Sequence, residues 1–270
     1  MRIDQLLVQR QLASTRSQAQ RLIAGGVEWL QGDAWRRVAK NGDEVPEEAE
    51  VRLLDDSEAR YVSRGGLKLE AALKHVGLSV EGLACLDVGQ STGGFTDCLL
   101  QHGARFVVGV DVGSAQLHPS LRDDPRVMCV EGVNARALDA SDLIAAHAEQ
   151  AGAGGPFYHD AEGAVDFVPE FDLIVADLSF ISQTLVLPSV VPMLKAGGTL
   201  LTLVKPQFEL QPGQVGKGGI VKDAAMYGIV EQRLRDVCAA LGFTVTAWFD
   251  SPIEGGDGNR EFFICAKHEK

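Results

Sequence analysis

Most of the chain, from Tyr61 to its end, alternates between short apolar runs and segments with helical spacing. Runs such as LACLDV, RFVVGVD and FDLIVADLSF have the composition of buried strands, and FTDCLLQH and AAMYGIVEQRLRDVCAALG have that of helices. Strands that alternate with helices form a mostly parallel sheet covered on both faces, because each crossover carries a helix. Residues 150–170, rich in Gly and Ala, interrupt the alternation and predict a surface loop. The alternation therefore predicts an α/β fold with one doubly wound domain over residues 61–270.

The first sixty residues show a different pattern. IDQLLVQRQL and TRSQAQRLIAGG have helical spacing, with Ser14 or Thr15 as the N-cap of the second helix and two glycines at its end. VEWLQG, AWRRVAK and AEVRLL are typical of short strands. We therefore expect a separate, small α+β domain over residues 1–60.

The formal net charge of −12 disfavours a nucleic-acid partner, because phosphate binding depends on Lys and Arg. The charge is unevenly distributed, however. Residues 1–42 contain seven basic and three acidic residues, whereas residues 43–60 contain two basic and eight acidic ones. We expect the basic N-terminal segment to contact the phosphates of structured RNA, with an ordinary solvated helix face as the alternative. The candidate RNA-binding residues are Arg2, Arg10, Ser14, Arg16, Gln18, Arg21 and Arg36.

Other classes of protein are disfavoured by what the chain lacks. Its five cysteines form no CxxC pair and have no histidines nearby, so neither a metal site nor a disulfide framework is expected. No apolar run approaches the roughly eighteen residues of a membrane helix, and the N-terminus has polar residues where a signal peptide needs an apolar block. We expect a cytoplasmic protein that binds neither a metal nor a membrane.

The segment LDVGQSTGGFTD predicts a nucleotide-binding turn. Its strand is expected to end at Val88 and its helix to begin near Gly94, which places the glycines where the backbone turns and passes close to a ligand. The glycine spacing is GxxxGG, which differs from the GxGxxG typical of NAD sites. Asp111, about twenty residues downstream, is a candidate acceptor for a ribose. The pattern thus indicates an adenosine-containing cofactor, with NAD and S-adenosylmethionine both open at this point.

Four polar residues are expected to meet at the carboxyl edge of the sheet. Asp177 ends the fourth predicted strand, Lys205 ends the fifth, Glu261 opens the last and Lys68 lies in the helix before the sheet. Taken singly, each has a simpler interpretation as a surface charge. Together, two lysines and two carboxylates can hold one lysine neutral and oriented, so that it accepts a proton from a hydroxyl that attacks a methyl group.

These residues lie in motifs that together resemble the TlyA (hemolysin A) family of FtsJ-like ribosomal RNA 2′-O-methyltransferases. The motifs are SRGGLKL, DVGQSTGGFTDCLLQ, DVGSAQLHPSLRDDPRV, ADLSFIS, LVKPQFE, VGKGGIVKD and SPIEGGDGNREFF. The resemblance covers nearly the whole chain, and the N-terminus resembles the S-four type RNA-binding module of ribosomal proteins. It implies a Rossmann-like class I methyltransferase sheet, S-adenosylmethionine as methyl donor, and a cytidine ribose in ribosomal RNA or ribosomal subunits as acceptor.

The resemblance also implies roles for residues. It assigns Lys68, Asp177, Lys205 and Glu261 to a catalytic tetrad, in which we expect Lys205 to take the proton. The turn is expected to hold the methionine end of the cofactor, Asp111 its ribose and the segment 131–134 to approach its adenine. The cofactor-binding residues it implies are Asp87, Gly89, Ser91, Thr92, Gly93, Gly94, Phe95, Asp111, Val112, Glu131, Asn134 and Asp177.

The chain departs from the family pattern at two places near the expected cofactor. It has GQSTGG in place of GASTGG and EGVNAR in place of ERTNAR. The first change is expected to put a bulky Gln90 beside the cofactor turn, and the second removes a charge near the adenine end. Three alternatives remain open: an RNA-binding protein with a vestigial catalytic site, a nicotinamide-dependent oxidoreductase, and the membrane-lytic protein that the name hemolysin suggests.

Overall fold

A computed structural model describes residues 1–13, 15–55, 59–151, 167–255 and 258–269. The chain divides into two compact units, Met1–Leu67 and Lys68–Lys270. The predicted domain boundaries, 1–60 and 61–270, remain a proposal. Ser14 and most of the predicted loop at 150–170 lie outside the described residues, and Gln150 belongs to a helix.

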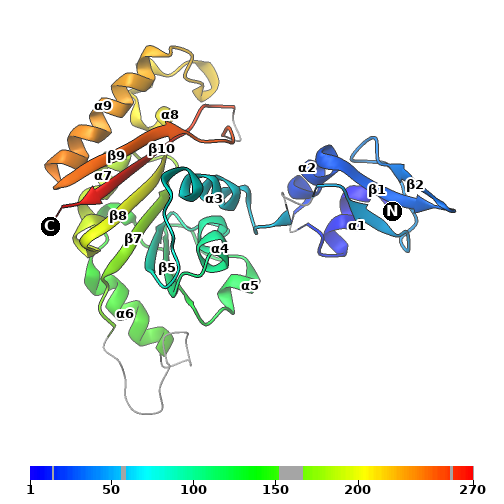
Figure 1. The fold of residues 1–270 in the computed structure, drawn as a ribbon, viewed down its shortest axis with the longest axis horizontal. Helices are drawn as coiled ribbons and strands as arrows, with labels where there is room; N and C mark the ends of the chain where they lie inside the picture. The colour runs from blue at the N-terminus through cyan, green and yellow to red at the C-terminus, as the bar shows by residue number, and fades with distance from the viewer. Residues whose placement is uncertain (14, 56–58, 152–166, 256–257, 270) are drawn as a thin grey trace. The chain divides into compact units, whose positions relative to one another are not determined.

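The smaller unit contains two helices and a three-stranded antiparallel sheet (Figure 1). Its elements are α1 (Ile3–Gln9), α2 (Arg16–Gly26), β1 (Val27–Gln31), β2 (Ala34–Arg37) and β3 (Val51–Leu53), with the strands in the order β2-β1-β3. Thr15 is the N-cap of α2, since its hydroxyl accepts a hydrogen bond from the amide of Gln18 at 3.1 Å. Ile3, Leu7 and Leu22 are buried in a core between the helices and the sheet.

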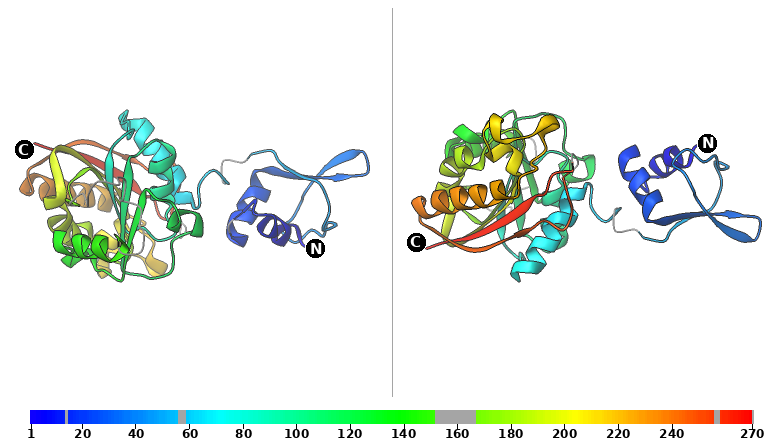
Figure 2. Two further views of the ribbon diagram at one scale, coloured as in Figure 1. Left: turned by 90° about the horizontal axis from the view of Figure 1, so that it is seen from below. Right: turned by 90° about the horizontal axis from the view of Figure 1, so that it is seen from above.

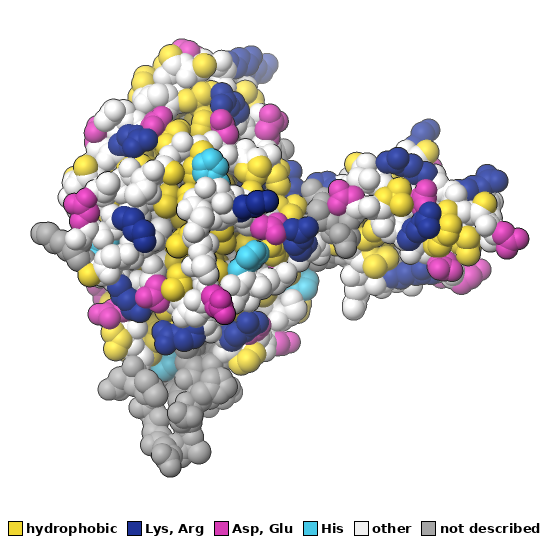
Figure 3. Space-filling view, viewed as in Figure 1, with side chains coloured by type: hydrophobic (Ala, Val, Ile, Leu, Met, Phe, Trp, Pro, Cys, Tyr) yellow, Lys and Arg dark blue, Asp and Glu magenta, His cyan; other side chains and the backbone are white. Residues whose placement is uncertain are grey.

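A buried carboxylate organises the start of this unit. Arg2 Nε and Nη2 donate to the two oxygens of Asp4 at 3.0 and 2.9 Å, and Arg16 Nη2 donates to Asp4 Oδ2 at 2.9 Å. The hydrogen bonds from Arg2 lower the pKa of Asp4 to about 2, and Arg16 adds to this effect. Asp4 is buried while both guanidinium groups are about half exposed, so it holds two basic side chains at the surface. Basic and acidic side chains are interspersed on the face of this unit seen in Figure 3.

The larger unit is an α/β fold, as predicted. Its helices are α3 (Arg64–Val76), which begins at the end of the smaller unit, α4 (Gly94–Gln101), α5 (Pro119–Arg122), α6 (Ala140–Ala151), α7 (Gln183–Val190), α8 (Pro206–Glu209) and α9 (Ala225–Ala240). Its strands are β4 (Ala84–Val88), β5 (Phe106–Asp111), β6 (Val127–Glu131), β7 (Phe171–Asp177), β8 (Leu194–Val204), β9 (Phe243–Asp250) and β10 (Phe262–His268). Short 3-10 turns, such as Ala135–Ala137, complete it.

The strand order, β6-β5-β4-β7-β8-β10-β9, creates one switch point. β4 to β8 run parallel, whereas β10 is antiparallel to both β8 and β9. The chain builds outward from β4 to β6 and then returns to add β7 on the other side of β4. In open α/β sheets, ligands bind at the carboxyl ends of the strands beside such a switch point. The topology therefore predicts a ligand-binding site at the carboxyl ends of β4, β5 and β7.

Helices cover both faces of this sheet (Figure 2). On one face, Leu143 of α6, Val186 of α7 and Leu234 of α9 belong to one apolar core with the strands. On the other face, His75 of α3 stacks on Phe249 and Phe95 of α4 stacks on Phe263, with ring centroids 3.9 and 6.4 Å apart. Burial on both faces explains why the strands are almost continuously apolar.

We predict that Asp4→Asn destabilises the smaller unit in a pH-dependent way. The folded pKa of Asp4 lies below its unfolded value, so its stabilising contribution is present above about pH 4 and is lost as the pH falls toward 2. The difference between wild type and variant in urea unfolding, followed by the fluorescence of Trp29 and Trp35 in a Trp248→Phe background, should therefore be largest near pH 6–7 and shrink toward pH 2. The exposed Asp33→Asn is the control. A difference that stays constant with pH would contradict the prediction.

Candidate functional site

The glycine turn packs directly against the end of β7. β4 ends at Val88 and α4 begins at Gly94, as predicted. Gly89 has a φ of +86°, and a Cβ atom placed on it would lie 2.6 Å from the carbonyl oxygen of Asp177. Any side chain at this position would both strain the backbone and collide with the neighbouring strand. Glycine is therefore required for the turn and β7 to approach one another.

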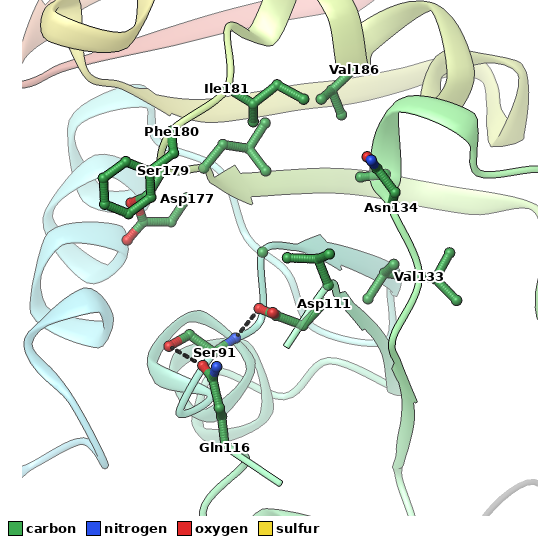
Figure 4. A pocket seen from close by; sticks show the side chains of 15 residues that line it. Ser91, Asp111, Gln116, Val133, Asn134, Asp177, Ser179, Phe180, Ile181 and Val186 are labelled. Atoms are coloured by element: carbon green, nitrogen blue, oxygen red, sulfur yellow. Dashed lines mark hydrogen bonds between the residues drawn. The ribbon is translucent and has the colours of Figure 1, made fainter. Parts of the chain in front are cut away.

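A pocket of about 540 Å³ opens at the carboxyl ends of β4, β5 and β7 (Figure 4). Its volume lies within the range of about 300–1,000 Å³ that is typical of small-molecule sites. Polar groups gather near the turn, and apolar side chains dominate elsewhere. The lining residues are Gly89, Ser91, Val110, Asp111, Val112, Gln116, Val133, Asn134, Ala135, Asp177, Leu178, Ser179, Phe180, Ile181 and Val186.

Asp111 joins two segments of the pocket wall. Its Oδ2 accepts a hydrogen bond from the amide of Ser91 and its Oδ1 one from the amide of Gly113, both at 2.7 Å. Ser91 Oγ also donates to Gln116 Oε1 at 3.3 Å (Figure 4). A carboxylate has about four lone-pair sites, so Asp111 can still accept from ligand hydroxyls. Val112 beside it is 72% exposed, an apolar side chain open to a ligand.

Six of the candidate cofactor residues line the pocket, and six do not. The first group comprises Gly89, Ser91, Asp111, Val112, Asn134 and Asp177. The second comprises Asp87, Thr92, Gly93, Gly94, Phe95 and Glu131. Phe95 is buried against Phe263, and Glu131 is paired with Arg122 at 3.2 Å. The amide of Ala115 also donates to Glu131, which lowers the pKa of its carboxyl group.

Sequence reasoning missed several residues that line the pocket. Gln116, Ser179, Phe180 and Ile181 lie in the motifs DVGSAQ and ADLSFIS, which follow strands β5 and β7. Their positions after strand ends were the available signal. The apolar members among them could not be told from core residues by pattern alone, because both are simply apolar.

Gln90 lies beside the turn, and its side chain points away from the pocket. It is buried, and its Nε2 donates to Thr96 Oγ1 at 3.0 Å, which in turn donates to Asp87 Oδ2 at 2.7 Å. Gly109 in β5 makes the room, since a Cβ there would lie 1.9 Å from Gln90 Cδ. Burial raises the pKa of Asp87 to about 7. Gln90, Thr96 and Asp87 thus form a buried polar network beneath the turn, and none of them lines the pocket.

The four tetrad candidates form two ion pairs at the carboxyl edge of the sheet. Lys68 of α3 pairs with Glu261, and their side chains are only 7% and 3% exposed. Lys205 Nζ lies 2.6 Å from Asp177 Oδ1, without the geometry of a hydrogen bond, and donates to Ser179 Oγ at 2.9 Å. Burial raises the pKa of Glu261, and the charges of Lys68 and Lys205 oppose this rise. All four charges are thus within electrostatic reach of one another, and Asp177 also borders the pocket.

The basic candidates of the smaller unit have varied surroundings. Arg10 donates to the carbonyls of Glu47 and Ala49, so much of its hydrogen-bonding capacity is used within the unit. Arg21 donates to the carbonyl of Ser17, and Arg36 is exposed on β2. Gln18 is buried and donates to the carbonyl of Tyr61 at 3.3 Å. Of the candidates in the described residues, Gln18 is therefore the one least accessible to a ligand.

The part of the chain that the structure describes contains neither a metal-binding group of side chains nor a membrane-spanning helix. No group of three or more His, Cys, Asp and Glu side chains there is arranged to hold a metal ion. Across these same ranges, no helix has both the length and the apolar character needed to cross a membrane.

The chain matches two known families. Residues 61–268 match the FtsJ-like methyltransferase family, and residues 1–26 match the S4 domain. The first match covers most of the larger unit, including the pocket and both ion pairs.

Relatives and solved structures resemble the chain over nearly its full length. It is 39% identical over 269 residues to the 16S/23S rRNA (cytidine-2′-O)-methyltransferase TlyA of Mycobacterium tuberculosis. This alignment covers 97% of the chain and 88% of the relative. It is 35% identical over 262 residues to Hemolysin A of Brachyspira hyodysenteriae, covering 97% and 98%. A structure of a Streptococcus thermophilus protein that carries the name hemolysin superposes with a TM-score of 0.69 at 38% identity, covering 99% of this chain and 88% of that one.

We predict that Asp87→Asn makes the protein more stable at alkaline pH. The folded pKa of Asp87 is raised above its unfolded value, so its contribution to stability declines as the pH rises from about 4 to about 7. The variant should match wild type near pH 4–5 and exceed it at pH 8 by on the order of 2–4 kcal/mol in urea unfolding. Asp123→Asn, at an exposed carboxylate, should show no such pH dependence. Equal stability of Asp87→Asn and wild type at pH 8 would rule out a buried neutral Asp87.

Proposed function

The chain belongs to the FtsJ-like methyltransferase family, and on this premise we propose that it transfers a methyl group from S-adenosylmethionine to the 2′-hydroxyl of a cytidine ribose in ribosomal RNA. The observation that supports the proposal is a cluster of two lysine–carboxylate pairs, one of which includes Asp177 in the wall of a pocket of about 540 Å³. The activity printed in the name of the mycobacterial relative supports the substrate class. In this proposal residues 1–60 form an S4-type RNA-binding domain, residues 61–270 the catalytic domain, and the protein acts in the cytoplasm on ribosomal RNA or ribosomal subunits.

The residues of the pocket fit S-adenosylmethionine. Gly89 leaves the backbone bare beside the cavity, Asp111 retains lone pairs for ribose hydroxyls, and Val112 and Val133 offer apolar surface for an adenine. When bound, S-adenosylmethionine would supply an electrophilic methyl group. We propose that the six candidates in the lining contact it and that Asp87, Thr92, Gly93, Gly94, Phe95 and Glu131 support the wall from behind.

Lys205 is the proposed proton acceptor. The 2′-hydroxyl must lose its proton as its oxygen forms the new bond, and we propose that Lys205, after it has released one proton to solvent, takes that proton at Nζ. Asp177 and Ser179 hold Nζ at the rim of the pocket through the contacts described above. We propose that the buried pair of Lys68 and Glu261 orients the ribose and stabilises the positive charge that Lys205 acquires. The rate gain then comes mainly from alignment within a desolvated, charged site.

Phe180 is the proposed platform for the target base. Its side chain is 90% exposed, its φ is +65°, and its ring lies 5.0 Å from that of Phe208. A left-handed backbone at a bulky residue is unfavourable, and such strain concentrates at functional sites. Aromatic rings that face solvent stack on unpaired RNA bases. We propose that the base of the target nucleotide stacks here, which would bring its ribose to Lys205.

The smaller unit is proposed to bind the phosphates of folded RNA. Arg2 and Arg16 are about half exposed, and each forms an ion pair with the buried Asp4. These ion pairs orient their guanidinium groups before RNA binds. Guanidinium groups bind phosphate oxygens in a bidentate way, and pre-orientation reduces the entropy lost on binding. Arg21 and Arg36 are proposed as further phosphate contacts.

We predict that the purified protein methylates ribosomal RNA at a cytidine 2′-oxygen and that Lys205→Ala lowers kcat by about a hundredfold or more. Transfer of labelled methyl groups to ribosomal RNA and to ribosomal subunits, with mapping of the modified ribose, measures this. S-adenosylmethionine binding by calorimetry should persist in the variant.

Lys195→Ala is a matched control. Lys195 pairs with Asp172 at 2.7 Å on the same two strands, β8 and β7, but at their opposite ends. This variant should keep full activity. Absence of any 2′-O-methylation by wild type would overturn the proposed function, and full activity of Lys205→Ala would favour an RNA-binding protein with a vestigial site.

We also predict that Phe180→Gly separates stability from activity. Glycine relieves the left-handed strain, so Tm should stay the same or rise, while loss of stacking should reduce kcat/KM for ribosomal RNA by about tenfold. Phe180→Tyr keeps the aromatic ring and should keep activity. Equal kcat/KM in Phe180→Gly and wild type would remove Phe180 from the substrate site.

A further inference from the structure

The segment Gly216–Lys222 carries two lysines that the proposed mechanism does not use. Lys217 and Lys222 are exposed, and neither forms an ion pair or side-chain hydrogen bond with any residue that the structure describes. Asp223, the nearest carboxylate along the chain, is engaged with the amide of Ala225 at the start of α9. Their ammonium groups can therefore bind an anionic ligand without first breaking an ion pair within the described residues.

The segment is held in one shape by a buried side chain. Asn259 is 2% exposed; its Oδ1 accepts from the amide of Val221 at 2.9 Å, and its Nδ2 donates to the carbonyl of Gly219 at 3.0 Å. The amide of Gly216 donates to the carbonyl of Ile220 at 2.9 Å, which closes the loop on itself. Both ends of the loop are therefore ordered before any ligand arrives.

The tip of the loop presents bare backbone. Gly218 has a φ of +77°, and a Cβ placed there would meet no atom within 4 Å. A partner can thus approach the main chain closely next to Lys217, while the Lys222 side chain passes the start of the loop, 3.9 Å from a Cβ placed on Gly216. Unobstructed backbone next to unpaired cations suits a phosphate group, which needs little space and strong donors.

The loop is connected to two of the proposed catalytic residues, to Lys205 along the chain and to Glu261 through Asn259. It follows Lys205 through α8, and Asn259 precedes Glu261 by two residues. Since consecutive Cα atoms are about 3.8 Å apart, Asn259 lies within about 8 Å of Glu261 along the backbone. The loop is therefore anchored, through Asn259, to the chain segment that carries Glu261.

We propose that Lys217 and Lys222 bind the phosphates of the RNA strand next to the target ribose. The inference rests on the proposed function and extends it, because it names the group that positions the strand at the catalytic edge. Phosphate contacts set register and orientation without reading the base, so this loop would fix which ribose faces Lys205. Asn259 is then a positioning residue that holds the loop.

The double variant Lys217→Gln/Lys222→Gln tests the proposal in the full-length protein, with ribosomal RNA as the probe. KM for ribosomal RNA should rise about tenfold while kcat stays within about twofold, since the lysines bind the strand and leave the reacting atoms alone. The slope of log affinity against log salt should become shallower by about 1.4, at about 0.7 for each lost contact with a single strand. Affinity for S-adenosylmethionine, by calorimetry, should not change.

The control is Lys74→Gln/Lys267→Gln. It has the same change in charge, on exposed lysines at the far ends of α3 and β10 from Lys68 and Glu261. It should leave KM and the salt slope unchanged. An unchanged KM and slope in Lys217→Gln/Lys222→Gln would overturn the proposal, as would an equal effect in the control. A selective loss of S-adenosylmethionine affinity would also overturn it, by assigning the loop to the cofactor carboxylate. If the double variant shows the expected change in salt slope but the wild-type protein methylates no ribose, the proposed function fails and the phosphate site stands.

Discussion

The close approach of Gly89 to the backbone carbonyl of Asp177 is the constraint on which the whole site depends. A Cβ at Gly89 would lie 2.6 Å from that oxygen, so the turn after β4 and the end of β7 can meet only because the side chain is absent. The carboxylate of the same Asp177 pairs with Lys205. The end of β7 thus borders the pocket and also belongs to an ion pair, so the proposed cofactor site and the proposed proton acceptor lie next to one another.

Buried charge at this edge is difficult to explain by stability alone. A buried ion pair such as that of Lys68 and Glu261 must overcome the desolvation of both groups, and an apolar pair of similar size often stabilises a fold as well or better. The raised pKa of Glu261 reflects the same cost. Charges retained in such a position, next to a pocket and at a topological switch point, are typical of functional sites. The strained Phe180 on the same rim belongs to the same pattern.

Much of the architecture could be predicted because it depends on local pattern. The end of β4 at Val88, the start of α4 at Gly94 and the strand-end positions of Asp177, Lys205 and Glu261 all follow from apolar runs and the residues that interrupt them. Since the carboxyl ends of parallel strands share one edge, Asp177 and Lys205 converge whatever the details of packing. Glu261 reaches the same edge from the amino end of the antiparallel strand β10. The four proposed catalytic residues could thus be named from the sequence, and their catalytic roles stay a prediction.

The sequence by itself determined the α/β alternation, the glycine turn and the set of polar residues at the strand ends, because periodicity and backbone chemistry are local properties. Only the tertiary structure decided which of these residues pair. Lys68 and Glu261 are 193 residues apart in the sequence. They form an ion pair because β10 runs antiparallel to β8, which places Glu261 at the edge of the sheet where β8 ends. Gln90 faces Thr96 and leaves the pocket because Gly109, on a neighbouring strand, makes room for it. Such partnerships depend on strand register and on the space between elements, which no local pattern encodes.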